Sequence, residues 1–358
     1  MNRYLFINPF GIGDVLFTTP VVRAIKNRYP RSFMGYWCNE RVEGILKNNR
    51  TIDKTFALSR GDLKRICELS KFEALKRFFG LLRSIRKEKF EVALDFSLDH
   101  RYALLAKLLG IKKRIGFNYK KRGFFLTDKI DIEGYSKKHV VEYYLDLLKF
   151  LDIEPASYKL ELAVEAAVKT KVSNLLAACG VAKEDLVAVI APAGGVSWGS
   201  SAAIKHWPAR KFARLSERLN KELRLKVLLV GDAAERGITE VVAMSAAAEV
   251  IDWAGKTTLE ELAAVIERSD IFIANDGGPL HMAAALGKKT VSFFGPVDPK
   301  VYGPYPPDPA RHIVLRRELE CSPCYQNFRF SGCLKDKECL NAIEVEEAFG
   351  AVKKLLEK

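Results

Sequence analysis

The sequence predicts an α/β protein built from two doubly wound domains, each with a parallel sheet. Short apolar runs alternate with helical segments along most of the 358 residues, which is the pattern of buried parallel strands joined by right-handed crossovers. At roughly 100–200 residues per domain, this length suits two domains that each bury a core. A hydrophobic fraction of 48% and a charged fraction of 28% are those of a globular protein and argue against disorder.

The first half of the chain opens with an expected strand at residues 4–8, a glycine-containing turn and a helix over about 14–28. Further apolar strands are expected at 33–38 and 92–96. In each case the run is short, continuous and rich in apolar residues, as buried parallel strands are.

Residues 62–90 have the pattern of an amphipathic helix, with apolar residues recurring every three or four positions. The apolar stripe is made of Ile66, Leu69, Phe72, Leu75, Phe78, Phe79, Leu82 and Ile85. The opposite face carries Lys64, Arg65, Lys71, Lys76, Arg77, Arg83, Arg86 and Lys87. Two interpretations stay open: a solvated surface helix packed on the core, or a basic amphipathic helix that rests on anionic lipid headgroups.

The second half repeats the alternation of strand and helix. Apolar strands are expected at residues 187–191, 226–231, 249–253, 271–275 and 290–294. A last helix is expected over about 344–357. Pro155 and a polar helix before the strand at 187 place the domain boundary near 160–185, so we divide the chain into residues 1–170, 171–343 and a C-terminal helix 344–358.

The net charge of +14 is concentrated in the first half of the chain. Residues 1–170 hold 33 Lys and Arg against 20 Asp and Glu, whereas residues 171–358 hold 25 against 24. A one-sided basic domain indicates an acidic partner: nucleic acid, an anionic membrane surface or a phosphorylated substrate. No run approaches the ~18 apolar residues of a membrane span, and the N-terminus lacks the features of a signal peptide. We therefore expect a cytoplasmic protein.

The first motif, NPFGIGD at residues 8–14, joins the first expected strand to the first helix. It begins like a dinucleotide-binding fingerprint, but Leu16 stands where the third glycine belongs. Asp14 falls at the helix start, where free N–H groups favour a carboxylate. It is either a helix-capping residue or a general base that projects from the carboxyl end of the strand.

The second motif lies at residues 191–207, where two glycines follow a strand and a serine-rich loop leads to Lys205. It lacks the lysine of a Walker phosphate-binding loop. Backbone N–H groups, the hydroxyls of Ser200 and Ser201, and the Lys205 ammonium still make a plausible phosphate cradle.

The third motif, NDGGPLHMAAALG at residues 275–287, follows another buried strand. Gly277 and Gly278 permit a sharp turn after Asp276, and a proline suits the first helical turn that follows. Helix-start N–H groups would then point beyond the carboxyl end of a parallel strand, where ligands bind in such sheets. His281 is either a structural residue or a donor to a phosphate at this turn.

Four of the seven cysteines gather near the end of the chain. They are Cys321, Cys324, Cys333 and Cys339, within residues 321–339. Four thiolates can form a tetrahedral site, with zinc as the default metal and iron as the alternative. Free thiols and disulfides are the other interpretations, and the expected cytosolic compartment disfavours disulfides.

Taken together, these segments resemble glycosyltransferase family nine, the ADP-heptose–lipopolysaccharide heptosyltransferase family. The matching stretches are GIGDVLFTTPVVRAIKNRYP (11–30), GGVSWGSSAAIKHWP (194–208), NDGGPLHMAAALG (275–287), FGPVDP (294–299) and the terminal CSPC…C…C pattern. The resemblance covers nearly the whole chain, although residues 40–170 contain no matching motif.

The resemblance implies a GT-B fold with two facing Rossmann-like domains and a last helix that crosses back to the first domain. Residues 1–170 would bind the acceptor, and residues 171–343, with the cysteine cluster, the donor. Asp14 matches the base that deprotonates the acceptor hydroxyl.

The donor residues follow from the same resemblance. Lys205 matches the lysine that meets the donor's phosphates, with Ser200 and Ser201 beside it. Asp276 matches the acid that contacts the donor sugar, while Gly277, Gly278 and His281 match the diphosphate-binding turn. Glu235 takes the place of an acid that contacts the ribose. Gly277 departs from members that carry a hydroxyl residue there.

The expected protein is therefore an inverting, peripheral membrane glycosyltransferase of lipopolysaccharide biosynthesis that acts at the inner face of the inner membrane. It would transfer heptose from ADP-heptose to a phosphorylated lipid acceptor of the inner core. No metal cofactor is expected in catalysis, because the sequence places no DxD pair at this site. One alternative keeps the fold but changes the nucleotide sugar or uses a protein acceptor. Another, a nucleic-acid-binding protein with a four-cysteine knuckle, is disfavoured because no binding module is recognisable.

Overall fold

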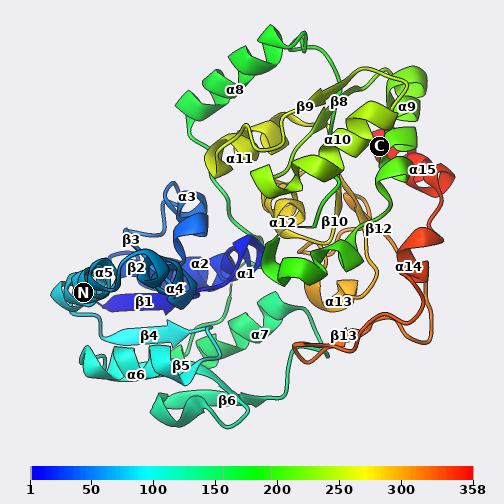
Figure 1. The fold of residues 1–358 in the computed structure, drawn as a ribbon. Helices are drawn as coiled ribbons and strands as arrows, with labels where there is room; N and C mark the ends of the chain where they lie inside the picture. The colour runs from blue at the N-terminus through cyan, green and yellow to red at the C-terminus, as the bar shows by residue number, and fades with distance from the viewer. Residues whose placement is uncertain (1, 156, 195, 358) are drawn as a thin grey trace. The chain divides into compact units, whose positions relative to one another are not determined.

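The computed structural model divides the chain into two compact units, residues 1–162 and 163–358 (Figure 1). It describes residues 2–155, 157–194 and 196–357, except for the side chains of 196–198 and 200. Each unit contains one six-stranded parallel sheet with helical connections between its strands. The boundary lies slightly before the expected position at residue 170, and the prediction of two doubly wound α/β units is confirmed.

The first unit has the sheet order β3-β2-β1-β4-β5-β6. Its elements are β1 (Arg3–Ile7), α1 (Ile12–Phe17), α2 (Thr19–Arg28), β2 (Phe33–Cys38), η1 (Glu40–Val42), α3 (Glu43–Leu46), β3 (Lys54–Ala57), α4 (Arg60–Leu69), α5 (Lys71–Lys87), β4 (Val92–Asp95), α6 (His100–Leu108), β5 (Lys113–Tyr119), η2 (Gly123–Phe125), β6 (Asp128–Ile132), α7 (Val140–Asp146) and η3 (Leu147–Leu151). Strand β1 pairs with β2 on one side and β4 on the other, so the direction of winding reverses between β1 and β4.

The second unit repeats this topology with the order β12-β11-β10-β7-β8-β9. Its elements are α8 (Ala166–Ala178), β7 (Val187–Ala191), η4 (Val196–Lys205), α9 (Ala209–Leu223), β8 (Lys226–Leu229), η5 (Ala233–Glu235), α10 (Arg236–Ser245), β9 (Val250–Asp252), α11 (Leu259–Arg268), β10 (Ile271–Asn275), α12 (Gly278–Ala285), β11 (Thr290–Phe293), α13 (Pro299–Tyr302), β12 (His312–Leu315), β13 (Tyr325–Gln326), β14 (Arg329–Phe330), α14 (Glu338–Asn341) and α15 (Val345–Leu356). Here the winding reverses between β7 and β10.

The central strands are buried on both faces, as their continuous apolar sequences predict. All five residues of β7 and of β10 are buried, and Leu5 and Ile7 of β1 are fully inaccessible. Gly35 in β2 is required by close packing, because an added Cβ would lie 2.3 Å from the ring of Phe90. These cores fix the sheets, and the loops at their carboxyl edges are held on a rigid frame.

The last helix belongs to the core of the second unit. Ala348, Val352 and Leu355 of α15 are buried in the same cluster as the strands of the second sheet, and α15 packs beside α9 (Figure 1). The helix expected at 344–358 therefore packs its buried face in the core of the second unit.

The expected helix at 62–90 is two helices, α4 and α5, that break at Ser70. Ser70 ends α4 in an extended conformation, and its hydroxyl accepts the Glu73 N–H at 3.2 Å, so it starts α5 as an N-cap. A serine side chain competes with the helical backbone in this way. Helix 14–28 likewise divides at Thr18 into α1 and α2.

Within the described residues, no helix is long and apolar enough to cross a membrane.

Candidate active site

Lys205 and Asp276 meet at the point where the winding of the second sheet reverses. Lys205 ends the loop after β7, and Asp276 directly follows the neighbouring strand β10. Lys205 Nζ lies 2.6 Å from Asp276 Oδ2, and both side chains are almost fully buried. Ligands of open α/β sheets bind at this kind of switch point. The structure thus brings together two residues that are 71 positions apart in the sequence.

Asn275 holds this pair in place, although the sequence analysis did not single it out. Its Oδ1 accepts the Trp207 N–H at 2.9 Å, and its Nδ2 donates to the Pro192 carbonyl at 2.6 Å. Trp207 Nε1 donates in turn to the Ile343 carbonyl at 3.0 Å. The amide therefore ties the loop after β7 to the end of β10. In the sequence, the feature that could have identified Asn275 is its position as the last residue of a buried apolar strand.

His281 lies on the first turn of α12, with Nε2 4.0 Å from Asp276 Oδ1. Burial lowers the pKa of His281 to about 4, although the Asp276 carboxylate opposes this shift. Burial also lowers the pKa of His206 to about 4, and its Nε2 accepts the Gly194 N–H at 2.9 Å. Both imidazoles are neutral at pH 7, so Lys205 is the cation of this cluster.

The glycines of the two loops allow their backbones to touch. A Cβ on Gly277 would lie 3.0 Å from the Gly194 carbonyl oxygen, and a Cβ on Gly194 would lie 3.1 Å from the His206 ring. Gly278 begins α12, and Pro279 occupies its first turn as expected. Helix-start N–H groups therefore lie beside the Lys205–Asp276 pair, where an anion is favoured.

The other residues that the sequence suggests for donor binding belong to loops at the same edge of the sheet. Glu235 follows β8, the neighbour of β7, and its Oε2 accepts the Asp232 N–H at 2.9 Å. Ser201 is exposed in η4. The side chain of Ser200 lies outside the described part of the chain. The order β10-β7-β8 thus places the loops of Asp276, Lys205 and Glu235 next to one another.

Asp14 lies in the turn after β1, at the equivalent edge of the first sheet. It is the third residue of α1, and its Oδ2 accepts the Gly11 N–H at 3.3 Å. Asn8 fixes the turn, because its Nδ2 donates to the Asp14 carbonyl at 3.0 Å and its Oδ1 accepts the Phe10 N–H at 3.1 Å. Asp14 therefore takes part in a capping box whose N-cap is Gly11, and its carboxylate is half-buried at the carboxyl edge of the sheet.

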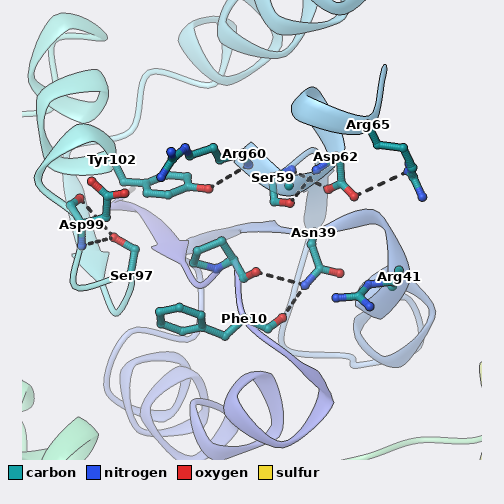
Figure 2. A pocket seen from close by; sticks show the side chains of 12 residues that line it. Phe10, Asn39, Arg41, Ser59, Arg60, Asp62, Arg65, Ser97, Asp99 and Tyr102 are labelled. Atoms are coloured by element: carbon teal, nitrogen blue, oxygen red, sulfur yellow. Dashed lines mark hydrogen bonds and ion pairs between the residues drawn. The ribbon is translucent and has the colours of Figure 1, made fainter. Parts of the chain in front are cut away.

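A pocket of about 470 Å³ opens at the carboxyl edge of the first sheet (Figure 2). The loops after β1, β2, β3 and β4 form it. Its lining residues are Pro9, Phe10, Asn39, Arg41, Ser59, Arg60, Gly61, Asp62, Arg65, Ser97, Asp99 and Tyr102. Apart from the loop of Asp14, none of this wall was expected, because loops without a motif leave no signal in a single sequence.

Two arginines supply the uncompensated charge of the pocket. Within the described residues, neither Arg41 nor Arg60 has an ion-pair partner, whereas Arg65 lies 2.6 Å from Glu40 and 3.6 Å from Asp62. Figure 2 shows Arg41 and Arg60 on different sides of the pocket, with the Arg60 N–H bound to the Tyr102 hydroxyl at 3.2 Å. The pocket is therefore suited to an anionic, hydroxylated ligand.

The four clustered cysteines lie within electrostatic reach of one another. Burial raises the pKa of the Cys339 thiol, and the thiols of Cys324, Cys333 and Cys321 raise it further. All seven cysteines are free thiols. Among the described residues, no three Cys, His, Asp or Glu side chains are arranged to hold a metal ion. The disulfide interpretation is thus not supported.

Comparison with protein families gives one clear match. The model of glycosyltransferase family 9 (heptosyltransferase) matches residues 78–334, more than half of the chain. The chain belongs to glycosyltransferase family 9. This transferase is 24% identical over 355 residues to lipopolysaccharide heptosyltransferase 3 of Escherichia coli K12, covering 96% of this chain and 95% of that relative.

Solved structures of this glycosyltransferase family have the same fold. A family 9 glycosyltransferase from Veillonella parvula superposes with a TM-score of 0.82 at 21% identity, covering 99% of this chain and 97% of that one. The Escherichia coli heptosyltransferase WaaC with ADP-2-deoxy-2-fluoro heptose superposes with a TM-score of 0.73 at 16% identity, covering 98% and 99%. The GT-B architecture expected from the sequence is confirmed.

The buried His281 of this glycosyltransferase makes its stability depend on pH. Its folded pKa of about 4 lies below the ordinary value of 6.5, so the unfolded chain takes up the proton first as the pH falls. We expect His281 to remove up to about 3 kcal/mol of stability between pH 6.5 and pH 4. Thermal unfolding of His281→Gln should show a shallower loss across this range, and identical pH slopes for both proteins would contradict the assignment.

Proposed function

We propose that this glycosyltransferase moves heptose from ADP-heptose onto a lipopolysaccharide inner-core acceptor, with inversion at the sugar carbon. The observation that carries the proposal is the buried Lys205–Asp276–His281 cluster beside the start of α12. It lies at the switch point of a family 9 chain, and that family is described as heptosyltransferases. A solved relative holds an ADP-heptose analogue, and a curated relative acts on lipopolysaccharide by name.

The second unit would hold the donor by its diphosphate. Helix-start N–H groups at Gly278 and the Lys205 ammonium supply positive potential without a metal ion. This potential would stabilise ADP as negative charge develops on the departing phosphate. Asp276 would hold Lys205 until the donor arrives and then contact the sugar, while Glu235 would accept hydrogen bonds from the ribose hydroxyls.

The first unit would bind the acceptor and take its proton. Arg41 and Arg60 would pair with phosphate or carboxylate groups in the pocket after β1–β4. As the acceptor oxygen attacks the anomeric carbon, its proton passes to the Asp14 carboxylate, the new glycosidic bond forms, and the bond to ADP breaks. Asp14 is the only residue to which we assign a catalytic proton transfer.

If the pocket binds the acceptor, changes in the pocket should affect the KM for the acceptor and not the KM for the donor. The double variant Arg41→Gln/Arg60→Gln should raise the KM for the acceptor about tenfold or more, because it removes two charge-assisted contacts. The KM for the donor should not change. Arg50→Gln, which replaces an exposed arginine outside the pocket, is the matched control. An unchanged acceptor KM in the double variant would refute the pocket assignment.

Another nucleotide sugar, or a protein acceptor, would use the same fold. A thermal-shift screen across nucleotide sugars decides the donor, since a ligand stabilises the fold according to its affinity. Transfer assays with lipopolysaccharide-core and protein acceptors then decide the acceptor. We expect ADP-heptose to give the largest shift and the core acceptor to be the one glycosylated. Stabilisation by a uridine-linked sugar alone would refute the donor assignment.

We also propose a structural zinc or iron ion at Cys321, Cys324, Cys333 and Cys339. What supports it is the gathering of four cysteines within residues 321–339 and the preference of clustered thiolates for these metals. No catalytic step passes through this ion. Elemental analysis of purified protein should give about one metal per chain, and less than about half an equivalent would favour plain thiols.

We place the enzyme at the inner face of the inner membrane, in the cytoplasm, as a peripheral protein. The excess of positive charge in residues 1–170 supports this placement, because anionic lipids attract basic surfaces. A lipid-borne acceptor would then be available without leaving the bilayer. Fractionation of cells expressing the chain tests the placement: it should sediment with membranes at low salt and be released at high salt.

A further inference from the structure

The tip of the α4–α5 hairpin carries an exposed patch of large apolar side chains. Leu69 is 88% exposed, Phe72 77%, Leu75 55% and Phe79 58%. Single exposed apolar residues are ordinary, but four within eleven positions form a contiguous surface of the kind that marks an interaction site. Of the two interpretations left open for residues 62–90, packing on the core does not hold for these four residues.

The patch and a set of basic residues share one face of α5. At 100° per residue, Phe72, Leu75 and Phe79 lie on the same side of the helix, and Arg83 and Arg86 continue that side toward its C-terminus. The opposite side, with Ala74 and Ile85, is buried. The exposed face of α5 is thus apolar in its first half and basic in its second.

The basic residues of the hairpin are largely free of acidic partners. Within the part of the chain that the structure describes, Arg83, Arg86 and Lys87 have no ion-pair partner. Lys76 has a long ion pair, with Nζ 3.7 Å from Glu73 Oε2. Lys64 and Lys71 of the same hairpin are also exposed. A patch of apolar residues bordered by unpaired cations fits an anionic bilayer, in which the apolar groups enter the lipid and the cations meet the headgroups.

The hairpin is also joined to the wall of the pocket. Glu40 lies 2.6 Å from Arg65 of α4 and 2.7 Å from Arg77 of α5, and its N–H donates to Asp62 at 3.2 Å. Arg60, Asp62 and Arg65 of α4 line the pocket (Figure 2). Any partner that binds the hairpin is therefore also brought next to one wall of the pocket.

We propose that the α4–α5 hairpin is the element that docks this enzyme on an anionic lipid bilayer and keeps the acceptor pocket beside the headgroups. This inference rests on the proposed function for the acceptor, but lipid binding itself does not depend on that function. A second copy of the chain is a poorer occupant, because its matching surface would offer Arg83, Arg86 and Lys87 no anionic groups, whereas lipid headgroups do.

The test compares vesicle binding of the full chain with that of Phe72→Ser/Phe79→Ser. The vesicles contain phosphatidylglycerol and phosphatidylcholine in a ratio of about one to two, or phosphatidylcholine alone. We expect the double variant to lose binding to the anionic vesicles by about tenfold or more, with an unchanged thermal melt because both rings are exposed. The matched control is Leu108→Ser/Met244→Ser, which removes residues that are 70% and 87% exposed elsewhere.

A charge variant tests the second half of the surface. Arg83→Gln/Arg86→Gln should weaken binding to the anionic vesicles about fivefold per charge at low salt, and much less at high salt. Equal binding of the full chain to both kinds of vesicle would overturn the proposal. So would unchanged binding of Phe72→Ser/Phe79→Ser, or a shift of that variant from dimer to monomer in solution, which would identify the patch as a self-association surface.

Activity assays separate this inference from the proposed function. Phe72→Ser/Phe79→Ser should lose turnover of acceptor embedded in vesicles while retaining turnover of the deacylated, water-soluble acceptor. Equal loss with both acceptors would overturn the docking role. If the full chain uses neither acceptor but still binds anionic vesicles through Phe72 and Phe79, the proposed function fails and the docking surface stands.

Discussion

Asp14→Asn should reduce kcat by a factor of about 10² to 10⁴ and leave the affinity for ADP unchanged. The amide keeps the oxygen that accepts the Gly11 N–H at 3.3 Å, so the cap of α1 and the turn after β1 should persist. The substitution removes only the capacity to accept the acceptor's proton. Single-turnover transfer and ADP titration measure the two quantities separately.

The control for this variant is Glu261→Gln. Glu261 is also the third residue of its helix, and its carboxylate accepts the Thr258 N–H at 2.7 Å. It therefore reproduces the capping role without the proposed chemistry, and its turnover should match that of the natural protein. If Asp14→Asn retains full turnover, or loses activity only in proportion to its stability, Asp14 is a cap and not the base.

Lys205→Ala should weaken ADP binding about tenfold to a hundredfold and also destabilise the second unit. Loss of a charge-assisted contact to phosphate accounts for the first effect. The second arises because Asp276 stays buried without the ammonium that lies 2.6 Å from it, and breaking such a buried pair costs about 3–5 kcal/mol. Calorimetric ADP titration and urea unfolding measure the two effects.

A double variant that neutralises both residues separates the effect on ADP binding from the effect on protein stability. Lys205→Met/Asp276→Asn removes both charges together, so it should recover much of the stability that Lys205→Ala loses. It should not recover ADP affinity, because the positive charge is still missing. Unchanged ADP affinity in either variant would show that the Lys205–Asp276 pair serves only the fold.

The place of Lys205 and Asp276 at the carboxyl edge of the second sheet was largely predictable from the sequence. Asp276 and Lys205 each follow a continuous apolar run, and buried parallel strands place the residues after them at one edge of a sheet. The glycines at 277 and 278 marked a sharp turn into a helix, which α12 provides. The sequence did not predict that Lys205 and Asp276 contact each other. That contact depends on β7 and β10 being neighbours, and the sequences of the strands do not reveal their order in the sheet.

The first unit was less predictable than the second for two physical reasons. Strand β5 begins with Lys113 and Arg114, and β6 alternates polar and apolar residues, so neither has the continuous apolar run of a central strand. The break between α4 and α5 depends on one serine within an uninterrupted helical pattern. The same pattern left burial of the stripe open, and in the structure Ile85 is the stripe residue that is fully buried.

Hydrogen exchange with and without ADP tests the central claim, that the donor's diphosphate binds at the switch point of the second sheet. We predict that ADP protects the backbone amides of residues 192–208 and 275–282, the loops after β7 and β10, and that Lys205→Met/Asp276→Asn abolishes this protection. Protection confined to the loops of the first sheet, with residues 275–282 unaffected at saturating ADP, would contradict the account.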